Sequence, residues 1–168
     1  MNAFEGQIEA LTATHERRNF AGGEPALDEY LRRFARQHAG SNLSRTYVAV
    51  AGGHIAGYYS LAMSAIRKEH LPTVHQKRFP NYPVPVARLA RLAVDQHQQG
   101  SGLGQLLLMD ALYRCHRLSG DIGSAGVVVD AKHTAAQRFY QKFNFETFPE
   151  SPLTLWLPTA AIAALFQK

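Results

Sequence analysis

Three glycines mark the segment of this sequence that is best suited to bind a phosphate. Gly100, Gly102 and Gly104 lie between an apolar run that ends at Asp95 and a stretch of helical periodicity that begins at Leu103. Glycine lets the backbone take positive φ angles and lets N–H groups approach a ligand without a Cβ in the way. The first turn of a helix directs further N–H groups and its positive dipole end at the same point. The spacing therefore predicts an anion site at a strand–loop–helix junction.

The glycine spacing departs from two common phosphate-binding loops. A P-loop needs Lys and then Ser or Thr after its last glycine, whereas Gln105 and Leu106 follow Gly104 here. A dinucleotide-binding loop needs the spacing G-x-G-x-x-G and an acidic residue that ends a second parallel strand about twenty residues further on. Here the spacing is Gly100-x-Gly102-x-Gly104, and no acidic residue ends such a strand. On its own the segment also fits a plain turn between a strand and a helix.

The elements predicted around this loop give a mixed α/β sheet, because strand and helix patterns alternate along the chain. The predicted helices are Pro25–Ala39, Leu103–Leu118, Thr134–Asn144 and Pro158–Gln167. The predicted strands are Arg45–Ala51, His54–Ile66, Val86–Asp95, Gly126–Ala131 and Leu153–Leu157, and Ile8–Leu11 fits the start of another. No repeat or linker interrupts the order, so we expect a single domain over residues 1–168.

Local signals refine several of these elements. Gly52-Gly53 predicts a hairpin turn, and Gly57 predicts a bend or a close backbone approach. Thr134 fits the N-cap of its helix, and Asn144 fits a left-handed residue at the C-terminal end. In the first helix, one face is apolar and the other predicts two surface pairs. The apolar face consists of Leu27, Tyr30, Leu31, Phe34, Ala35 and His38, and the pairs are Asp28–Arg32 and Glu29–Arg33.

Positive charge is concentrated in one segment. Between Ile66 and Arg91 there are six basic residues and one acidic residue, a net charge of +5 that equals that of the whole chain. This segment, with the proline-rich loop Glu69–Pro85, fits either a solvated loop or a surface for a polyanion. No apolar run of 18 residues predicts a membrane span, and Met1–Ala10 lacks the pattern of a secretory signal.

Neither the cysteine nor the histidines predict a reactive or metal site. Cys115 is the one cysteine, which excludes an internal disulfide, favours a reducing cytosol and falls at a core position of its helix. His70 and His75 are five residues apart, and no histidine pair has metal-ligand spacing on a predicted helix. We therefore expect no metal.

Two motifs together resemble the GNAT (Gcn5-related N-acetyltransferase) superfamily. The first is Gln99-x-x-Gly102-x-Gly104, which is similar to the acyl-CoA loop. The second is the strand Val127-Val-Val-Asp-Ala with the helix Ala136-x-x-Phe139-Tyr140-x-x-Phe143-Asn-Phe145, in which Asn144 replaces the usual glycine. Lys132-His133 stands where many members carry Asn. The resemblance implies an α/β GNAT fold with a mixed, mostly antiparallel sheet that is splayed at the acetyl-CoA site and flanked by helices.

A narrower resemblance covers residues 20–158. It rests on Glu24–Leu31, Gly57–Leu61, Pro83–Pro85, Arg88–Asp95, Asp110–Leu112 and Pro152–Leu155. These segments look like the GNAT toxins of type II toxin–antitoxin modules, although the Phe-x-Cys-Gly of that family is Phe20-Ala-Gly-Gly23 here. The resemblance implies a bacterial cytoplasmic enzyme that acetylates the α-amino group of aminoacyl-tRNA. It also implies a ribbon-helix-helix antitoxin and a homodimer.

The same resemblance implies a set of site residues. The backbone of Leu92, Ala93 and Val94 would bind the pantetheine arm of acetyl-CoA, and Tyr140 would be the general acid. The pyrophosphate would contact the backbone of Gln99, Gly100, Ser101, Gly102, Leu103 and Gly104, with His133, Ala136 and Phe139 completing the cofactor site.

The acceptor amine is less well defined by the sequence. Asp95 and Asp130 end two strands, and we interpret each as ordering its loop rather than as a base. An α-amino group with a pKa near 8 needs less help to lose its proton than a lysine with a pKa of about 10.4, so the missing base favours an aminoacyl ester. The residues expected to contact RNA are Arg36, Lys77, Arg78, Arg88 and Arg91, of which Arg88 and Arg91 lie on opposite faces of a strand. A protein N-terminus, a polyamine, a small amine or a silent acetyl-CoA-binding module remain alternatives.

Overall fold

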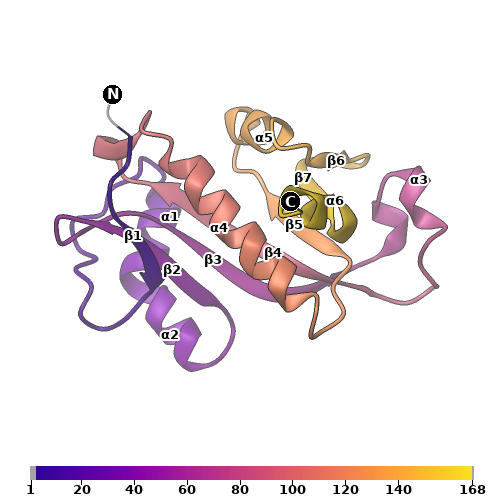
Figure 1. Cartoon of the computed structure of the whole chain (residues 1–168), viewed down its shortest axis with the longest axis horizontal. Coiled ribbons are helices and arrows are strands. Elements are labelled where there is room, and N and C mark those ends of the chain that lie inside the picture. Colours follow the sequence, from indigo (N-terminus) through magenta and orange to yellow (C-terminus); the bar gives the residue numbers. More distant parts are fainter. Residues whose placement is uncertain (1–2, 168) are drawn as a thin grey trace. The chain divides into compact units, whose positions relative to one another are not determined.

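The computed structural model describes residues 3–167, which form a seven-stranded sheet with helices (Figure 1). The strands are β1 (Gln7–Ala10), β2 (Arg45–Ala51), β3 (His54–Ile66), β4 (Val84–Val94), β5 (Gly126–Asp130), β6 (Glu146–Phe148) and β7 (Ser151–Pro158). The strand order is β1-β2-β3-β4-β5-β7-β6. Strands β4 and β5 pair in parallel, whereas β1–β2, β2–β3, β5–β7 and β6–β7 pair antiparallel. The mixed sheet predicted from the sequence is confirmed.

Helical segments separate these strands. They are α1 (Pro25–Glu29), the π-helix η1 (Tyr30–Phe34), α2 (Ala35–Gly40), the 3₁₀ turn η2 (Lys68–His70), α3 (Thr73–Gln76), the 3₁₀ turn η3 (Gln96–Gln98), α4 (Leu103–Leu118), α5 (Thr134–Gln141) and α6 (Thr159–Leu165). The chain divides into two compact units. Unit 1 comprises residues up to Ala62 with Ala90–Ala111, and unit 2 comprises Met63–Leu89 with residues from Leu112 onward.

The hairpin of unit 1 forms as its glycines predict. Gly52 and Gly53 both have positive φ angles, 59° and 79°, as the tightest hairpin turns require. The register between β2 and β3 shifts between Ala49 and Val50, opposite Gly57. A Cβ at Gly57 would lie 2.9 Å from Cδ1 of Leu107 and 3.0 Å from the carbonyl oxygen of Ala93. The predicted close approach at Gly57 is therefore confirmed.

Strand β3 of unit 1 carries a helix on each face, because successive side chains point to opposite sides. The Tyr58 hydroxyl donates to the carbonyl of Leu27 in α1, 2.7 Å away. The Tyr59 hydroxyl donates to Oδ2 of Asp110 in α4, 2.5 Å away. Both tyrosine side chains are fully buried, so the polar tip of each ring needs the partner that it finds.

The first helical stretch differs from the prediction in its middle turn. A π turn over Tyr30–Phe34 inserts an extra residue and rotates the next turn of the helix, so Phe34 is 39% exposed instead of joining the buried face. Glu29 and Arg33 form the predicted surface pair at 2.9 Å. The predicted Asp28–Arg32 pair is wrong. Asp28 is buried and accepts from the Gly22 N–H, and Arg32 donates to the carbonyl of Phe20.

Unit 2 is built on strand β5, which is buried between β4 and β7. Its apolar run pairs in register with Ala87–Leu89 on one side and with Leu155–Leu157 on the other. Helix α5 follows and ends before Asn144, whose φ of 69° confirms the left-handed position. His133 is the N-cap, with Nδ1 accepting from the N–H of Ala136, so the expected cap at Thr134 is wrong by one residue. The short strand β6 was not predicted.

Candidate active site

The predicted phosphate loop opens helix α4 with the geometry that its glycines allow. Gly100 and Gly102 both have φ angles of 85°, a conformation that costs other residues free energy. A Cβ at Gly102 would meet nothing within 4 Å, so glycine is needed there for the turn and not for space inside the protein. The N–H groups of Gly102, Leu103 and Gly104 have no backbone acceptor within the described chain. The loop therefore fits an anion.

Neighbouring side chains brace this loop within unit 1. Nε2 of Gln99 donates to the carbonyl of Gly22 at 3.1 Å, and Oγ of Ser101 donates to the carbonyl of Gln98 at 2.6 Å. The carboxylate of Asp95 accepts from the N–H groups of Ala21 and His97 and contacts the His97 ring. Burial would raise the pKa of Asp95, but these hydrogen bonds outweigh it and lower the pKa. Asp95 orders two loops, as the sequence predicts.

Strand β4 leads into the loop and extends beyond its pairing with β5. The parallel pairs run from Ala87 to Leu89, and β4 continues to Val94. Ala93 is buried and Leu92 and Val94 are half-buried. The Asp95 N–H donates to the carbonyl of Ala56 at 2.8 Å, which ties the end of β4 to β3. The three residues expected to bind the pantetheine arm therefore lie on a strand that unit 1 holds firmly on its β3 side.

Unit 2 holds Tyr140 on helix α5 among aromatic rings. The side chain is 7% exposed, and its ring centroid lies 5.2 Å from that of Phe139 and 5.5 Å from that of Phe145. Burial raises the pKa of Tyr140 well above its ordinary value, and the nearby charge of Asp130 adds to the effect. The phenol therefore stays protonated at neutral pH and can donate a hydrogen bond.

Asp130 is occupied by other residues of unit 2. Arg88 Nη1 forms an ion pair with its Oδ2, and the Thr154 hydroxyl donates to Oδ1 at 3.1 Å. Nε of Arg88 also donates to the Ser64 hydroxyl. This carboxylate is thus held in place between two strands, in line with the interpretation that it does not act as a base.

The other expected cofactor residues lie on the first turns of α5. His133 uses its ring nitrogen as the helix cap, which requires that nitrogen to be an acceptor. Ala136 and Phe139 are half-buried on the same helix as Tyr140. The expected set is thus distributed over both units, with Leu92–Gly104 in unit 1 and His133–Tyr140 in unit 2.

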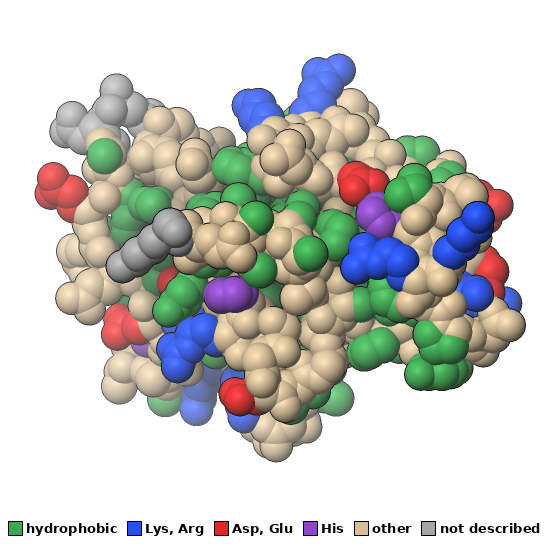
Figure 2. Space-filling view, turned by 45° about the vertical axis from the view of Figure 1, so that its right-hand side comes forward, with side chains coloured by type: hydrophobic (Ala, Val, Ile, Leu, Met, Phe, Trp, Pro, Cys, Tyr) green, Lys and Arg blue, Asp and Glu red, His purple; other side chains and the backbone are tan. Residues whose placement is uncertain are grey.

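The expected RNA-contacting residues fall into two groups. Arg36, Lys77 and Arg78 are exposed, and Figure 2 shows Lys and Arg beside apolar side chains where the α3 end of unit 2 faces the viewer. Exposed apolar residues there include Val74 and Tyr82. Arg88 and Arg91 are half-buried instead. The guanidinium of Arg91 packs 3.5 Å from the ring centroid of Tyr30.

The described residues 3–167 contain no group of three or more His, Cys, Asp or Glu side chains arranged to hold a metal ion. None of the helices in this range has the length and hydrophobicity to cross a membrane. Cys115 is buried, which raises the pKa of its thiol to about 12 and keeps it unreactive.

Comparison with known proteins agrees with this arrangement. Residues 42–147 match the model of the acetyltransferase (GNAT) domain. The chain is 41% identical, over 83% of its length and 83% of the relative's, to the tRNA-acetylating toxin of Mycobacterium tuberculosis. The chain belongs to the GNAT family of acetyltransferases.

Two solved structures are similar over almost the whole chain. AtaT complexed with acetyl-methionyl-tRNAfMet has a TM-score of 0.88 and 31% identity, and the match covers 97% of this chain and 100% of AtaT. A tyrosine-to-phenylalanine mutant of AtaT, bound to the C-terminus of the antitoxin AtaR and acetyl-CoA, has a TM-score of 0.84 and 27% identity. That match covers 96% of this chain and 98% of the mutant. These structures show the fold of this chain to be that of the GNAT toxins.

Proposed function

We propose that this protein transfers an acetyl group from acetyl-CoA to the α-amino group of an aminoacyl-tRNA and so acts as a toxin that blocks translation. The observation that carries this proposal is the 41% identity to a tRNA-acetylating toxin over 83% of both chains. The solved relative AtaT in complex with an acetylated methionyl-tRNA supports the same substrate class.

The loop that opens α4 fits the pyrophosphate of acetyl-CoA. Its free N–H groups and the helix dipole supply positive partial charges, and the positive φ angles of Gly100 and Gly102 direct the backbone outward. We assign the pyrophosphate to Gln99–Gly104 and the pantetheine arm to the backbone of Leu92, Ala93 and Val94. His133, Ala136 and Phe139 complete the cofactor site in this proposal. Acetyl-CoA supplies the thioester that is consumed.

Tyr140 is the proposed proton donor. The amine nitrogen attacks the thioester carbonyl and the carbon–sulfur bond breaks. The Tyr140 hydroxyl donates toward the departing sulfur, and the one proton that the amine loses on forming the amide balances the proton gained by the CoA thiol. A buried phenol has a pKa above that of a thiol, so Tyr140 acts first as a hydrogen-bond donor to the developing negative charge. Within the described residues no hydrogen bond of its hydroxyl competes with this role.

The state of the two strand-end carboxylates supports an aminoacyl ester as acceptor. Asp95 is satisfied by the loops that it orders, and Asp130 is held by Arg88 and Thr154. Neither is placed as a free base for a lysine, whereas an α-amino ester with a pKa at or below about 8 is partly neutral without one. The exposed Arg36, Lys77 and Arg78, with Arg88 and Arg91, are the proposed contacts to the RNA backbone.

The remaining features of the proposal concern assembly. The family match at residues 42–147 includes parts of both units, which supports one GNAT domain over residues 1–168. We place the protein in the bacterial cytoplasm, as a homodimer with a ribbon-helix-helix antitoxin. The AtaT–AtaR complex supports an antitoxin partner.

A transfer assay with labelled acetyl-CoA tests the acceptor. Aminoacyl-tRNA, deacylated tRNA, a peptide with a free N-terminus and a polyamine are offered in parallel. Label should appear only on aminoacyl-tRNA and should be released with the amino acid on mild alkaline hydrolysis. Preferential labelling of the peptide or polyamine would replace the proposal with one of the alternatives, and no turnover on any acceptor would favour a silent acetyl-CoA-binding module.

A further inference from the structure

A basic hollow in unit 1 lies outside every residue group assigned above. It has a volume of about 440 Å³ and is lined by Ala13, His15, Glu16, Arg17, Arg18 and Arg32. Three of these six side chains are arginines, brought together from the loop before Phe20 and from the π-helix η1. Because the three arginines come from two separate segments, only the fold reveals the cluster.

Backbone carbonyls hold two of the arginines without neutralising them. Nη1 of Arg17 donates to the carbonyl of Arg32 at 3.1 Å, and Nη1 of Arg32 donates to the carbonyl of Phe20 at 3.0 Å. The Arg32 carbonyl belongs to the π-helix η1, and the Phe20 carbonyl belongs to the loop before α1. Both guanidinium groups are therefore oriented by neutral acceptors and keep their full positive charge.

The acidic groups near the hollow are too few to balance this charge. Glu16 is the carboxylate in its lining, and its Oε1 accepts from the backbone N–H of Arg18 at 2.7 Å. His15 contacts Glu9 at 3.2 Å. Within residues 3–167, Arg17, Arg18 and Arg32 form no ion pair, so the lining carries two more positive than negative charges when His15 is neutral.

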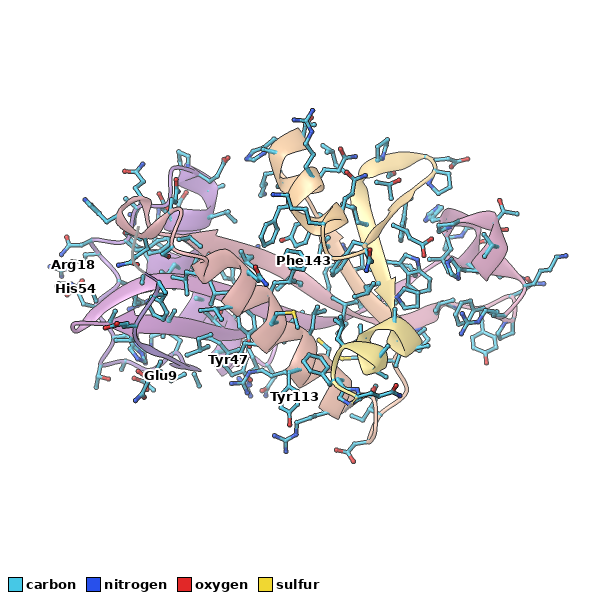
Figure 3. The ribbon with its side chains drawn as sticks, turned by 45° about the horizontal axis from the view of Figure 1, so that its top comes forward. Glu9, Arg18, Tyr47, His54, Tyr113 and Phe143 are labelled. Atoms are coloured by element: carbon cyan, nitrogen blue, oxygen red, sulfur yellow. The ribbon has the colours of Figure 1, made fainter. Side chains whose placement is uncertain are left out.

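A second hollow adjoins the first through Glu16. It has a volume of about 310 Å³, with an apolar part formed by Phe20, Ala51, Ile55 and Ala56 and a polar part formed by Glu16, Asn19, His54, Asp95, His97 and Gln98. Figure 3 labels Arg18 and His54, one from each hollow, at the same end of unit 1 in that view. A charged compartment next to a mixed apolar and polar one matches a nucleotide, which joins a phosphate to a base.

We propose that the arginine hollow binds a backbone phosphate of the RNA substrate, with the attached nucleoside in the adjoining hollow. Guanidinium groups recognise phosphate oxygens with charge-assisted, often bidentate hydrogen bonds. This inference rests on the proposed function, because it assigns part of the RNA to residues of unit 1 that the proposed function leaves unassigned. It makes Arg18 a substrate-binding residue that touches no reacting atom.

Arg18 offers a clean test because its side chain supports no other element. Arg18→Ala removes one charge and leaves the carbonyl contacts of Arg17 and Arg32 intact, and Arg18→Glu reverses the charge. Arg33→Ala is the matched control, since Arg33 is an exposed arginine of the same unit that pairs with Glu29 outside the hollow. Binding of deacylated tRNA is measured for each protein from about 50 to 200 mM salt.

Arg18→Ala should weaken tRNA binding about fivefold at low salt and reduce the slope of log K against log salt by about 0.7–0.9, the value of one phosphate contact. Arg18→Glu should weaken binding further, and Arg33→Ala should match the wild type. In the transfer assay, KM for aminoacyl-tRNA should rise in Arg18→Ala while kcat and KM for acetyl-CoA stay unchanged.

Two results would overturn the assignment. If the slope of log K against log salt is unchanged in both Arg18 variants, Arg18 does not contact the RNA. If only the KM for acetyl-CoA rises, the hollow binds the phosphates of the cofactor instead. The tRNA-binding measurement does not depend on turnover. It therefore separates failure of this inference from failure of the proposed function, which the transfer assay reports.

Discussion

The surroundings of Tyr140 keep its hydroxyl group protonated. The neighbouring Phe139 and Phe145 rings exclude water, and the charge of Asp130 disfavours a second negative charge nearby. Tyr140→Phe removes the hydroxyl and preserves the ring that packs in this cluster. We expect kcat to fall by about 10²–10⁴, the usual contribution of a general acid, with little change in acetyl-CoA affinity or in Tm.

Calorimetry with acetyl-CoA and single-turnover acetylation measure these quantities separately. Phe139→Leu serves as a control for the packing of the cluster, since it alters the aromatic neighbour and keeps the hydroxyl. Turnover at the wild-type rate in Tyr140→Phe would exclude Tyr140 from the mechanism.

We expect the pH dependence of the reaction to arise from Tyr140, the proposed proton donor, and from the amine. The neutral, reactive fraction of an α-amino group increases as pH rises toward and beyond its pKa of about 8. In the proposed mechanism Tyr140 acts in its protonated form, and its raised pKa means that this form persists to more alkaline pH. We therefore expect kcat/KM to rise up to about pH 8 and to stay level through pH 9. Initial rates measured faster than ester hydrolysis give the profile, and a decline between pH 8 and 9 would contradict it.

At the scale of elements, Gly57 sets how closely β3, β4 and α4 pack in unit 1. A Cβ there would lie 3.0 Å from the Ala93 carbonyl and 2.9 Å from Leu107, closer than normal packing allows. Gly57→Ala should lower the free energy of unfolding by about 1–3 kcal/mol through overpacking. Urea denaturation measures the change.

Gly40→Ala is the matched control for this substitution. Gly40 ends α2, and a Cβ there meets nothing within 4 Å. Alanine should leave stability unchanged or raise it by up to about 1 kcal/mol, because glycine is the poorer helix former. Equal effects of the two substitutions would show that the close approach at Gly57 is not what limits stability.

Local signals explain which elements the sequence predicts well. Gly52-Gly53, Asn144 and the glycines before α4 need unusual φ angles in any context, so their residue types alone reveal the turns. The GNAT motifs then predict the family correctly. The roles of Tyr140 and of the residues expected around it stay predictions.

Features that depend on distant partners could not be predicted. Asp28 is buried because Gly22 supplies an N–H donor, and the cluster of Arg17, Arg18 and Arg32 exists because a π turn meets a loop. The N-cap at His133 uses a ring nitrogen instead of the usual hydroxyl or carboxylate. None of these leaves a periodic pattern in the sequence.

At the scale of the whole molecule, Cys115 reports on global opening. The thiol is buried in α4, and burial raises its pKa to about 12. A thiol reagent should therefore react with it only when the protein unfolds, at a rate that tracks urea-induced unfolding. Stopped-flow labelling measured with circular dichroism tests this, and fast labelling of the native protein would show local opening instead.

The hydrogen bonds between the loop around Ala21 and Gly22 and the phosphate loop have a consequence for protease sensitivity. Ala21 and Gly22 are joined to Asp95 and Gln99 by hydrogen bonds, so whatever orders one loop must order the other. Linkage is reciprocal, so acetyl-CoA at Gln99–Gly104 should protect the peptide bonds around Gly22 from cleavage. Limited proteolysis would then show protection by acetyl-CoA at Gly22, which lies 77 residues before Gln99 in the sequence. A chain nicked there should bind acetyl-CoA more weakly.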